Sequence, residues 1–305
     1  MICGEGQEVP RPMSRALALL LIAAAAANPI AEQRAREVLA RAREALGGAK
    51  RPTPLRSVSL EAELRRVQPV EGGESRDMSG ELAVDALLPD RYLKVETLSP
   101  FPGAPAFSVG TGLDGQQAWR APVGGGGGPH MVVRVVDGEG PGAAEALLRR
   151  TRGEMIRLLL VALAADPADG SVTFTHAGEA EAPEGRADRI DIADAQGPLG
   201  TLFVDKATHR PLFLSFKTPA QRMQVMRAAS HADAERARAS AEPRAAGPAP
   251  ESEARIYVSD WKRVGGILLP HRLSQAIEGG ASEEWTIKKW TLDPAFKPDH
   301  FKKQK

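Results

Sequence analysis

The stretch SVSLEAELR, residues 57–65, decides the fold class. Its apolar residues alternate with polar ones, the apolar set being Val58, Leu60, Ala62 and Leu64. A period of two is typical of an antiparallel strand with one buried face. The stretch therefore predicts a sheet that is covered on one side and solvated on the other.

Strand-like runs of similar length follow downstream of this stretch. Turn residues separate them, including Pro89-Asp90, Asp114-Gly115 and the glycine run 124–128. Short strands joined by short turns favour a meandering antiparallel sheet over βαβ units. The predicted strands are 78–88, 91–98, 105–110, 116–122, 131–136, 171–177, 187–193, 199–205, 211–217, 255–262, 266–275 and 282–291.

Upstream of the first strand, residues 31–46 carry apolar side chains at helical spacing. Gly47 and Gly48 follow directly. Glycine readily adopts the left-handed conformation that ends many helices. The segment is predicted to be an amphipathic helix with a glycine stop.

The first residues have the pattern of an export signal. Arg11 and Arg15 precede an apolar run from Ala16 to Ala27, which is too short to span a bilayer. The small residues at its end predict cleavage before Asn28, so residues 1–27 are interpreted as a signal peptide and the mature protein as periplasmic. A buried or signal-anchor helix is the alternative, and either Met1 or Met13 is the start.

Composition excludes several classes of protein. The single cysteine, Cys3, precedes the apolar run, so the mature chain would have no disulfide, thiolate metal site or cysteine nucleophile. The formal net charge is +1, from 40 basic and 39 acidic residues, which argues against a nucleic-acid partner. A hydrophobic content of 42% suffices for one large core and is too low for a multi-span membrane protein.

A second helix is predicted from about Ala143 to Ala165. Its first half is amphipathic, but the run 158–163 is apolar nearly all round. Such a helix must be covered on several sides or must close over an apolar cavity. Ordinary core packing is the alternative. The candidate ligand contacts of a lid are Met155, Leu158, Leu159, Ala162 and Leu163.

The segment 221–254 differs in composition from the rest. It is rich in Ala, Arg, Glu, Ser and Pro and has no aromatic residue. It buries too little apolar area to offset its ordering entropy, so it is predicted to be a frayed helix followed by a flexible linker. Strands lie on both sides of it. The segment is therefore interpreted as an insertion within one domain, residues 28–305.

No motif predicts chemistry. Residues 110–115 read GTGLDG, which matches a dinucleotide-binding pattern by letter, but a strand follows where that motif needs a helix. A hairpin turn is favoured. The glycine run 124–128 lacks the Lys-Ser or Lys-Thr of a phosphate loop, the six histidines show no ligand spacing, and there is no G-x-S-x-G motif. The chain is expected to be non-enzymatic, with no catalytic residue, metal site or cofactor.

Several short motifs occur in a characteristic order. They are the helix ending Ala45-Leu46-Gly47-Gly48, Pro89-Asp90-Arg91-Tyr92, Asp114-Gly115 with Trp119, Asp205 with Thr208, Ser259-Asp260-Trp261, Leu269-Pro270-His271, and Asp293-Pro294 with Phe301. In this order the chain resembles the LolA-like outer-membrane lipoprotein-sorting family. The resemblance implies a mainly β (α+β) fold, an open antiparallel β-barrel or curved sheet with covering helices, around an apolar cavity that shields acyl chains.

Three hypotheses for function follow. The first is a periplasmic carrier of lipid or of lipidated protein acyl chains, not integral to the membrane after signal cleavage. The second is a non-catalytic structural or interaction module of the cell envelope, with a filled core and an envelope protein partner held by residues 221–254. The third is a hydrolase whose site no motif identifies.

Overall fold

The computed structural model describes residues 28–48, 55–69, 75–99, 105–123, 131–135, 142–165, 170–182, 185–219, 223–227, 251–278 and 280–303. The expected signal peptide lies outside this described part. The same holds for residues 221–222 and 228–250 of the expected insertion, residues 221–254.

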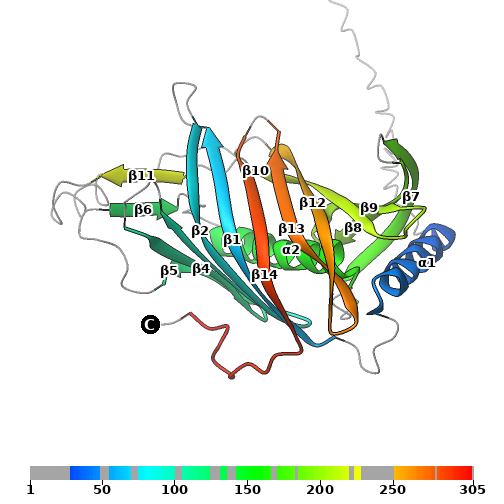
Figure 1. The fold of residues 1–305 in the computed structure, drawn as a ribbon, viewed down its shortest axis with the longest axis horizontal. Helices are drawn as coiled ribbons and strands as arrows, with labels where there is room; N and C mark the ends of the chain where they lie inside the picture. The colour runs from blue at the N-terminus through cyan, green and yellow to red at the C-terminus, as the bar shows by residue number, and fades with distance from the viewer. Residues whose placement is uncertain are drawn as a thin grey trace, which may run out of the picture.

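Twelve strands form one antiparallel sheet (Figure 1). Its order, β5-β4-β3-β2-β1-β14-β13-β12-β10-β9-β8-β7, consists of two meanders that meet where β1 pairs with β14. In the described part of the chain the edge strands β5 and β7 do not pair, so the sheet is open. The predicted fold class, an open curved antiparallel sheet with covering helices, is confirmed.

The strands of this sheet are mostly 8–14 residues long. They are β1 (Ser57–Pro69), β2 (Ser75–Leu87), β3 (Arg91–Ser99), β4 (Phe107–Asp114), β5 (Gln117–Pro122), β7 (Val172–Ala182), β8 (Gly185–Asp194), β9 (Gly197–Asp205), β10 (Pro211–Pro219), β12 (Glu251–Val264), β13 (Ile267–Ile277) and β14 (Ser282–Leu292). A separate two-stranded sheet pairs β6 (Met131–Val135) with β11 (Met223–Arg227).

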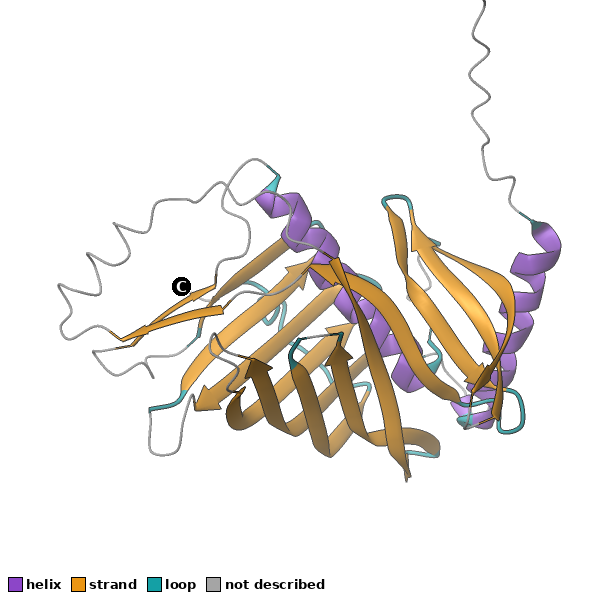
Figure 2. Cartoon of the chain, turned by 90° about the horizontal axis from the view of Figure 1, so that it is seen from above, coloured by secondary structure: helices purple, strands orange, loops and turns teal. Residues whose placement is uncertain are grey.

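Helix α1 (Pro29–Ala45) lies beside β7 at one end of the sheet (Figures 1 and 2). The side chain of Asn28 caps it by accepting hydrogen bonds from the backbone N–H groups of Ile30 and Ala31. Its buried face is formed by Ala35, Val38, Leu39 and Ala42. The predicted amphipathic helix is thus present. Its apolar face is held against the sheet, since burying apolar surface stabilises a helix of this length more than propensity does.

Gly47 ends α1 in the left-handed conformation, with φ of +88°. A methyl group at this position would lie 2.7 Å from the carbonyl oxygen of Gly266, in the turn between β12 and β13. The backbone hydrogen bond from Leu268 N to Leu46 O, 2.7 Å long, fixes this approach. The glycine stop therefore also allows the end of α1 to contact the turn between β12 and β13.

We expect Gly47→Ala to lower the free energy of unfolding by about 2–4 kcal/mol. Alanine is unfavourable in the left-handed conformation, and its methyl group would also clash with the carbonyl oxygen of Gly266. Gly266→Ala is the matched control. It has φ of +87° but nothing within 4 Å of an added methyl group, so only the backbone penalty applies. Urea denaturation measures both. Equal losses in the two variants would contradict the proposed contact.

Helix α2 (Ala143–Leu163) connects the first meander to the second and lies across the concave side of the sheet (Figure 2). It contacts strands of both meanders, namely β3, β4, β5, β9, β10, β12 and β13. Every residue from Leu158 to Leu163 is buried. The helix that the sequence predicts for 143–165 is therefore covered on several sides.

The hairpin of β4 and β5 explains the GTGLDG motif. Gly110 and Gly112 lie beside the indole of Trp119, and a methyl group at Gly112 would lie 2.3 Å from Trp119 Cε2. The indole N–H donates to the carbonyl oxygen of Phe301, 2.8 Å away, which ties the C-terminal segment to the sheet. The predicted hairpin is confirmed, and these two glycines make room for a ring.

Two predictions about the sheet differ from the structure. The strand expected at 105–110 extends to Asp114, because the glycines at its end pair with β5 like any strand residue. A frayed helix was expected to begin at Gln221, whereas residues 223–227 form β11 opposite β6. Pairing with a partner distant in the sequence overrides the local composition there.

Candidate functional site

A cavity of about 100 Å³ lies between α2 and the concave face of the sheet. Both meanders contribute to its walls. Its apolar lining consists of Leu158, Val161, Phe216, Ile256, Leu273 and Trp285. Its polar lining consists of Arg66, Lys94, Glu96, Thr111, Arg120, Arg150, Glu154, Arg157, Thr218, Gln275 and Glu283. The cavity is thus amphipathic, whereas the family resemblance implied an apolar one.

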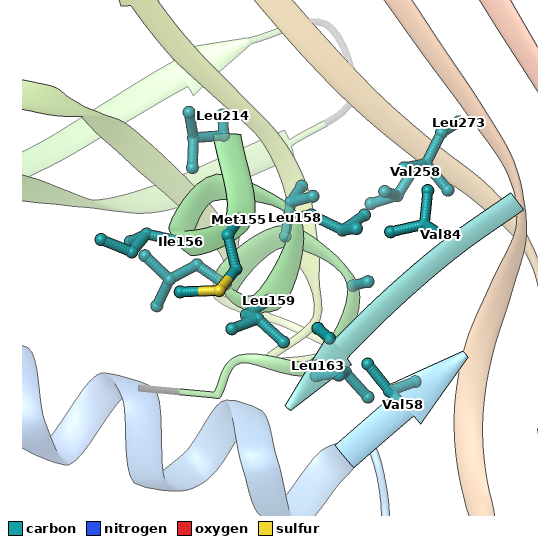
Figure 3. Close-up of a cluster of buried hydrophobic side chains, with 14 of the residues drawn as sticks. Val58, Val84, Met155, Ile156, Leu158, Leu159, Leu163, Leu214, Val258 and Leu273 are labelled. Carbon is teal, nitrogen blue, oxygen red and sulfur yellow. The ribbon is translucent and has the colours of Figure 1, made fainter. Parts of the chain in front are cut away.

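The five predicted lid residues occupy different places. Leu158 lines the cavity. The others, Met155, Leu159, Ala162 and Leu163, are packed in the hydrophobic core at 7% exposure or less. Figure 3 shows Leu158 on the side of α2 toward the strands that carry Val258 and Leu273, while Leu163 lies toward Val58. The residues remain predictions as ligand contacts.

A network of ion pairs in the charged wall joins three strands and one helix. Arg66 of β1 pairs with Glu96 of β3 and with Glu283 of β14, both at 2.5 Å. Lys94 pairs with Glu154 of α2 at 2.5 Å and lies 3.5 Å from Glu96. These five residues form the buried ion cluster. It joins β1, β3 and β14 to α2 beneath the sheet.

In this cluster, burial and ion pairing shift the pKa values in opposite directions. Burial by itself raises the pKa of Glu96, but the Lys94 ammonium and the Arg66 guanidinium lower that pKa to about 2. The pKa of Glu154 is lowered in the same way, since Lys94 outweighs burial. Burial lowers the pKa of Lys94, yet Glu154 and Glu96 raise it more. Glu96, Glu154 and Lys94 are therefore charged at neutral pH.

We expect the cluster to make stability fall in acid. The pKa of Glu96 in the folded protein, about 2, is below its ordinary value of 4.5, so its contribution is complete above about pH 4.5 and disappears as the pH falls toward 2. The loss is about 3 kcal/mol for this one carboxyl. Urea denaturation across that pH window measures it. If the free energy of unfolding of Glu96→Gln falls just as steeply in acid, Glu96 is not the cause of the pH dependence.

Two aromatic rings belong to the charged region. Tyr92, fully buried, donates its hydroxyl to Glu154 at 3.3 Å, and burial raises its pKa well above the ordinary value. The indole of Trp285 donates to Glu283. Both rings therefore hold carboxylates of the cluster in place, and Trp285 is also part of the apolar wall.

Arg157 occupies a different environment. Its guanidinium lies 4.1 Å from the centre of the Phe216 ring and donates to the carbonyl oxygen of Leu199 at 3.3 Å. Burial lowers its pKa to about 10. It thus remains a cation at neutral pH, held by a ring face and a backbone carbonyl.

The charged wall was not predicted from the sequence, although the sequence contains a signal for it. Lys94 and Glu96 are in phase with buried Tyr92 and Leu98, so they lie on the covered face of β3. On α2 the cavity residues 150, 154, 157, 158 and 161 recur at helical spacing. Charged residues in register with an apolar face indicate an interior polar cluster. This register can be recognised in the sequence from the spacing of the residues.

The described residues hold no group of three His, Cys, Asp or Glu side chains placed to bind a metal ion. The described helices include none with the length and apolar character needed to cross a bilayer.

No protein-family model and no curated protein sequence matches this chain. Among the solved structures that are similar to it are three that match over nearly all of their own length. They are a LolA superfamily protein of Nitrosomonas europaea (10% identity, TM-score 0.46, 88% of this chain and 97% of that chain), an outer membrane lipoprotein-sorting protein domain of Vibrio parahaemolyticus (11%, 0.43, 88% and 97%) and a DUF1329 family protein of Desulfovibrio piger (11%, 0.43, 89% and 97%). Two of these descriptions name the family that the motifs resemble. At such identities and TM-scores the likeness transfers no function.

Proposed function

We propose that this protein is an exported, periplasmic carrier that binds an apolar chain, a lipid or the acyl group of a lipidated protein, between α2 and the concave face of the open sheet. The observation that supports this most is the cavity under α2, which strands of both meanders line. Binding needs no catalytic group. The free energy comes from removing methylenes from water, at about 0.8 kcal/mol each.

The size of the cavity defines what binding requires. An engineered apolar cavity of roughly 150 Å³ takes one benzene molecule. A cavity of about 100 Å³ therefore accepts only a few carbon atoms. A whole acyl chain requires α2 to move away from the sheet, and the apolar residues of α2 and the sheet would then line the enlarged space. In this proposal α2 is a lid that the ligand displaces.

A second candidate function is favoured by the packing around α2. All five predicted lid residues belong to the hydrophobic core, and four of them do not line the cavity, which is what a structural or interaction module with a filled interior requires. In that case α2 never leaves the sheet and the cavity is a packing defect beside the buried ion cluster.

Thiol labelling separates the two functions. The only cysteine of the chain is Cys3, in the expected signal peptide, so Leu158→Cys gives the mature protein a single thiol. Leu158 is 6% exposed, so a reagent reaches it when α2 opens or when the whole protein unfolds. We expect labelling in the absence of denaturant, slowed by bound dodecanoate. Ala144→Cys, exposed on the same helix, controls for reagent and should label at one rate throughout.

Direct binding completes the test. The full chain purified under native conditions is expected to carry extractable lipid, detected by mass spectrometry, and the delipidated protein to take up a fluorescent fatty acid. Protein that is repeatedly free of lipid, takes up no fatty acid and labels at Leu158→Cys only on global unfolding would refute the carrier and support the filled module.

A further inference from the structure

The ionised side chains in the cavity lining are already engaged by partners within the protein. In the buried ion cluster, Arg66 contacts Glu96 and Glu283, each at 2.5 Å, and Lys94 contacts Glu154 at 2.5 Å. Breaking such a pair from one side is costly, because it leaves a buried charge without compensation. A ligand therefore gains little by competing for the members of this cluster.

The three other cations of the lining are engaged as well. Arg157 contacts the ring of Phe216 and interacts electrostatically with Glu154. Arg120 and Arg150 also have interaction partners. The charged wall thus gives no reason to expect a charged ligand.

Three neutral polar side chains of the same lining are in a different situation. They are Thr111 of β4, Thr218 of β10 and Gln275 of β13. Thr111 is 5% exposed and Thr218 is 8% exposed. Over the ranges that the structure describes, no hydrogen bond engages any of these three side chains. The hydrogen-bonding capacity that the lining leaves open is therefore neutral.

The alternation along each strand directs these side chains toward the cavity. The two glycines that flank Thr111 lie beneath Trp119 on one face of β4, so Thr111 is on the other face. Thr218 is in phase with Phe216, which is buried and lines the cavity. Gln275 is likewise in phase with the cavity residue of its own strand two positions earlier. Strands of both meanders thus present a polar group to one space.

A buried hydroxyl that forms no hydrogen bond is unfavourable, because it loses water on folding without gaining another partner. Most buried polar side chains in folded proteins are therefore hydrogen-bonded. The hydroxyl of threonine and the amide of glutamine each donate and accept. Ligand groups that also donate and accept complement them, and hydroxyls are the smallest such groups.

We propose that the cavity binds the head group of an uncharged, single-chain amphiphile that carries hydroxyls, such as a monoacylglycerol, and that Thr111, Thr218 and Gln275 form hydrogen bonds with it while the acyl chain extends under α2. This inference rests on the proposed function and specifies its ligand. The volume of about 100 Å³ limits the head group to a small polyol and excludes a sugar chain. The apolar lining, which includes Leu158 and Leu273, would receive the first carbons of the chain.

Calorimetry with three probes that share one acyl chain tests the head group. The probes 1-dodecanoylglycerol, methyl dodecanoate and dodecanoate are titrated into the full, delipidated protein. The first has two hydroxyls, the second is neutral without a hydroxyl, and the third is charged. We expect 1-dodecanoylglycerol to bind about tenfold tighter than either of the others, which corresponds to one or two net hydrogen bonds.

Variants assign the effect to the two buried hydroxyls. Thr111→Val and Thr218→Val are each expected to weaken binding of 1-dodecanoylglycerol about threefold and to leave binding of methyl dodecanoate unchanged. Without ligand, both variants should resist urea at least as well as the unaltered protein, because neither removed hydroxyl has a partner among the described residues. Thr175→Val, exposed on β7, is the control and should change neither affinity.

The outcomes separate this inference from the proposed function. If methyl dodecanoate or dodecanoate binds as tightly as 1-dodecanoylglycerol, the head-group inference is overturned and the carrier stands. A preference for 1-dodecanoylglycerol that persists in both valine variants would overturn the role of these hydroxyls. The same holds if both variants lose stability and weaken the two esters equally, since that indicates a structural role. Binding of none of the three probes would overturn the inference and the carrier together.

Discussion

Replacing Glu96 with glutamine is expected to lower the free energy of unfolding by about 3–5 kcal/mol, the usual cost of breaking a buried ion pair from one side. Glu96 is 3% exposed and contacts both Arg66 and Lys94. Glutamine keeps the shape of the side chain but leaves two buried cations with less opposing charge. Urea or thermal denaturation monitored by circular dichroism measures the loss.

Glu61→Gln is the matched control. Glu61 lies on the exposed face of β1, where its carboxylate is 3.3 Å from Lys289 and both side chains are at least 60% exposed. Exposed pairs contribute little, because water and salt screen them. A loss in Glu96→Gln no larger than in Glu61→Gln would show that the buried ion cluster does not stabilise the fold.

Truncating Leu158 to alanine is expected to have opposite effects on stability and binding. Removing a buried leucine side chain costs about 2–5 kcal/mol of unfolding free energy. The same change enlarges the cavity that Leu158 lines. One further methylene accommodated there is worth about 0.8 kcal/mol, so the affinity for dodecanoate should rise about fourfold. Denaturation and calorimetry on one preparation give both values.

Leu160→Ala provides the comparison. Leu160 lies in the same helix and is fully buried, but it does not line the cavity. We expect Leu160→Ala to lose about as much stability as Leu158→Ala, with no gain in affinity for dodecanoate. If Leu158→Ala also gains none, the cavity does not receive the ligand and the filled module is favoured.

The sheet could be predicted from sequence because its signal is local. In β1 and β2 the alternation of apolar and polar residues matches the alternation of buried and exposed side chains, and the turn after β2 falls at Pro89-Asp90. Such a pattern depends only on the geometry of one strand. Which strands become neighbours, in particular β1 with β14, is not encoded in any single stretch.

The site was less predictable, because its residues are distant in sequence. Arg66, Glu96 and Glu283 meet only after the two meanders join, so no spacing along the chain reveals their contact. The lid prediction relied on the hydrophobicity of α2 and therefore found the apolar side of the helix. The same prediction did not include Glu154 and Arg157. These two residues line the cavity, although charged residues are usually expected on the exposed face of a helix.

The pairing of β1 with β14 has a consequence for biogenesis. More than 200 residues separate partners such as Leu64 and Trp285, so the seam closes only after nearly all of the polypeptide has been synthesised. Until then β1 presents an unsatisfied backbone edge to whatever surrounds the nascent molecule. A product truncated before Ser282 would keep that edge permanently. Its fate would be aggregation or degradation rather than partial function.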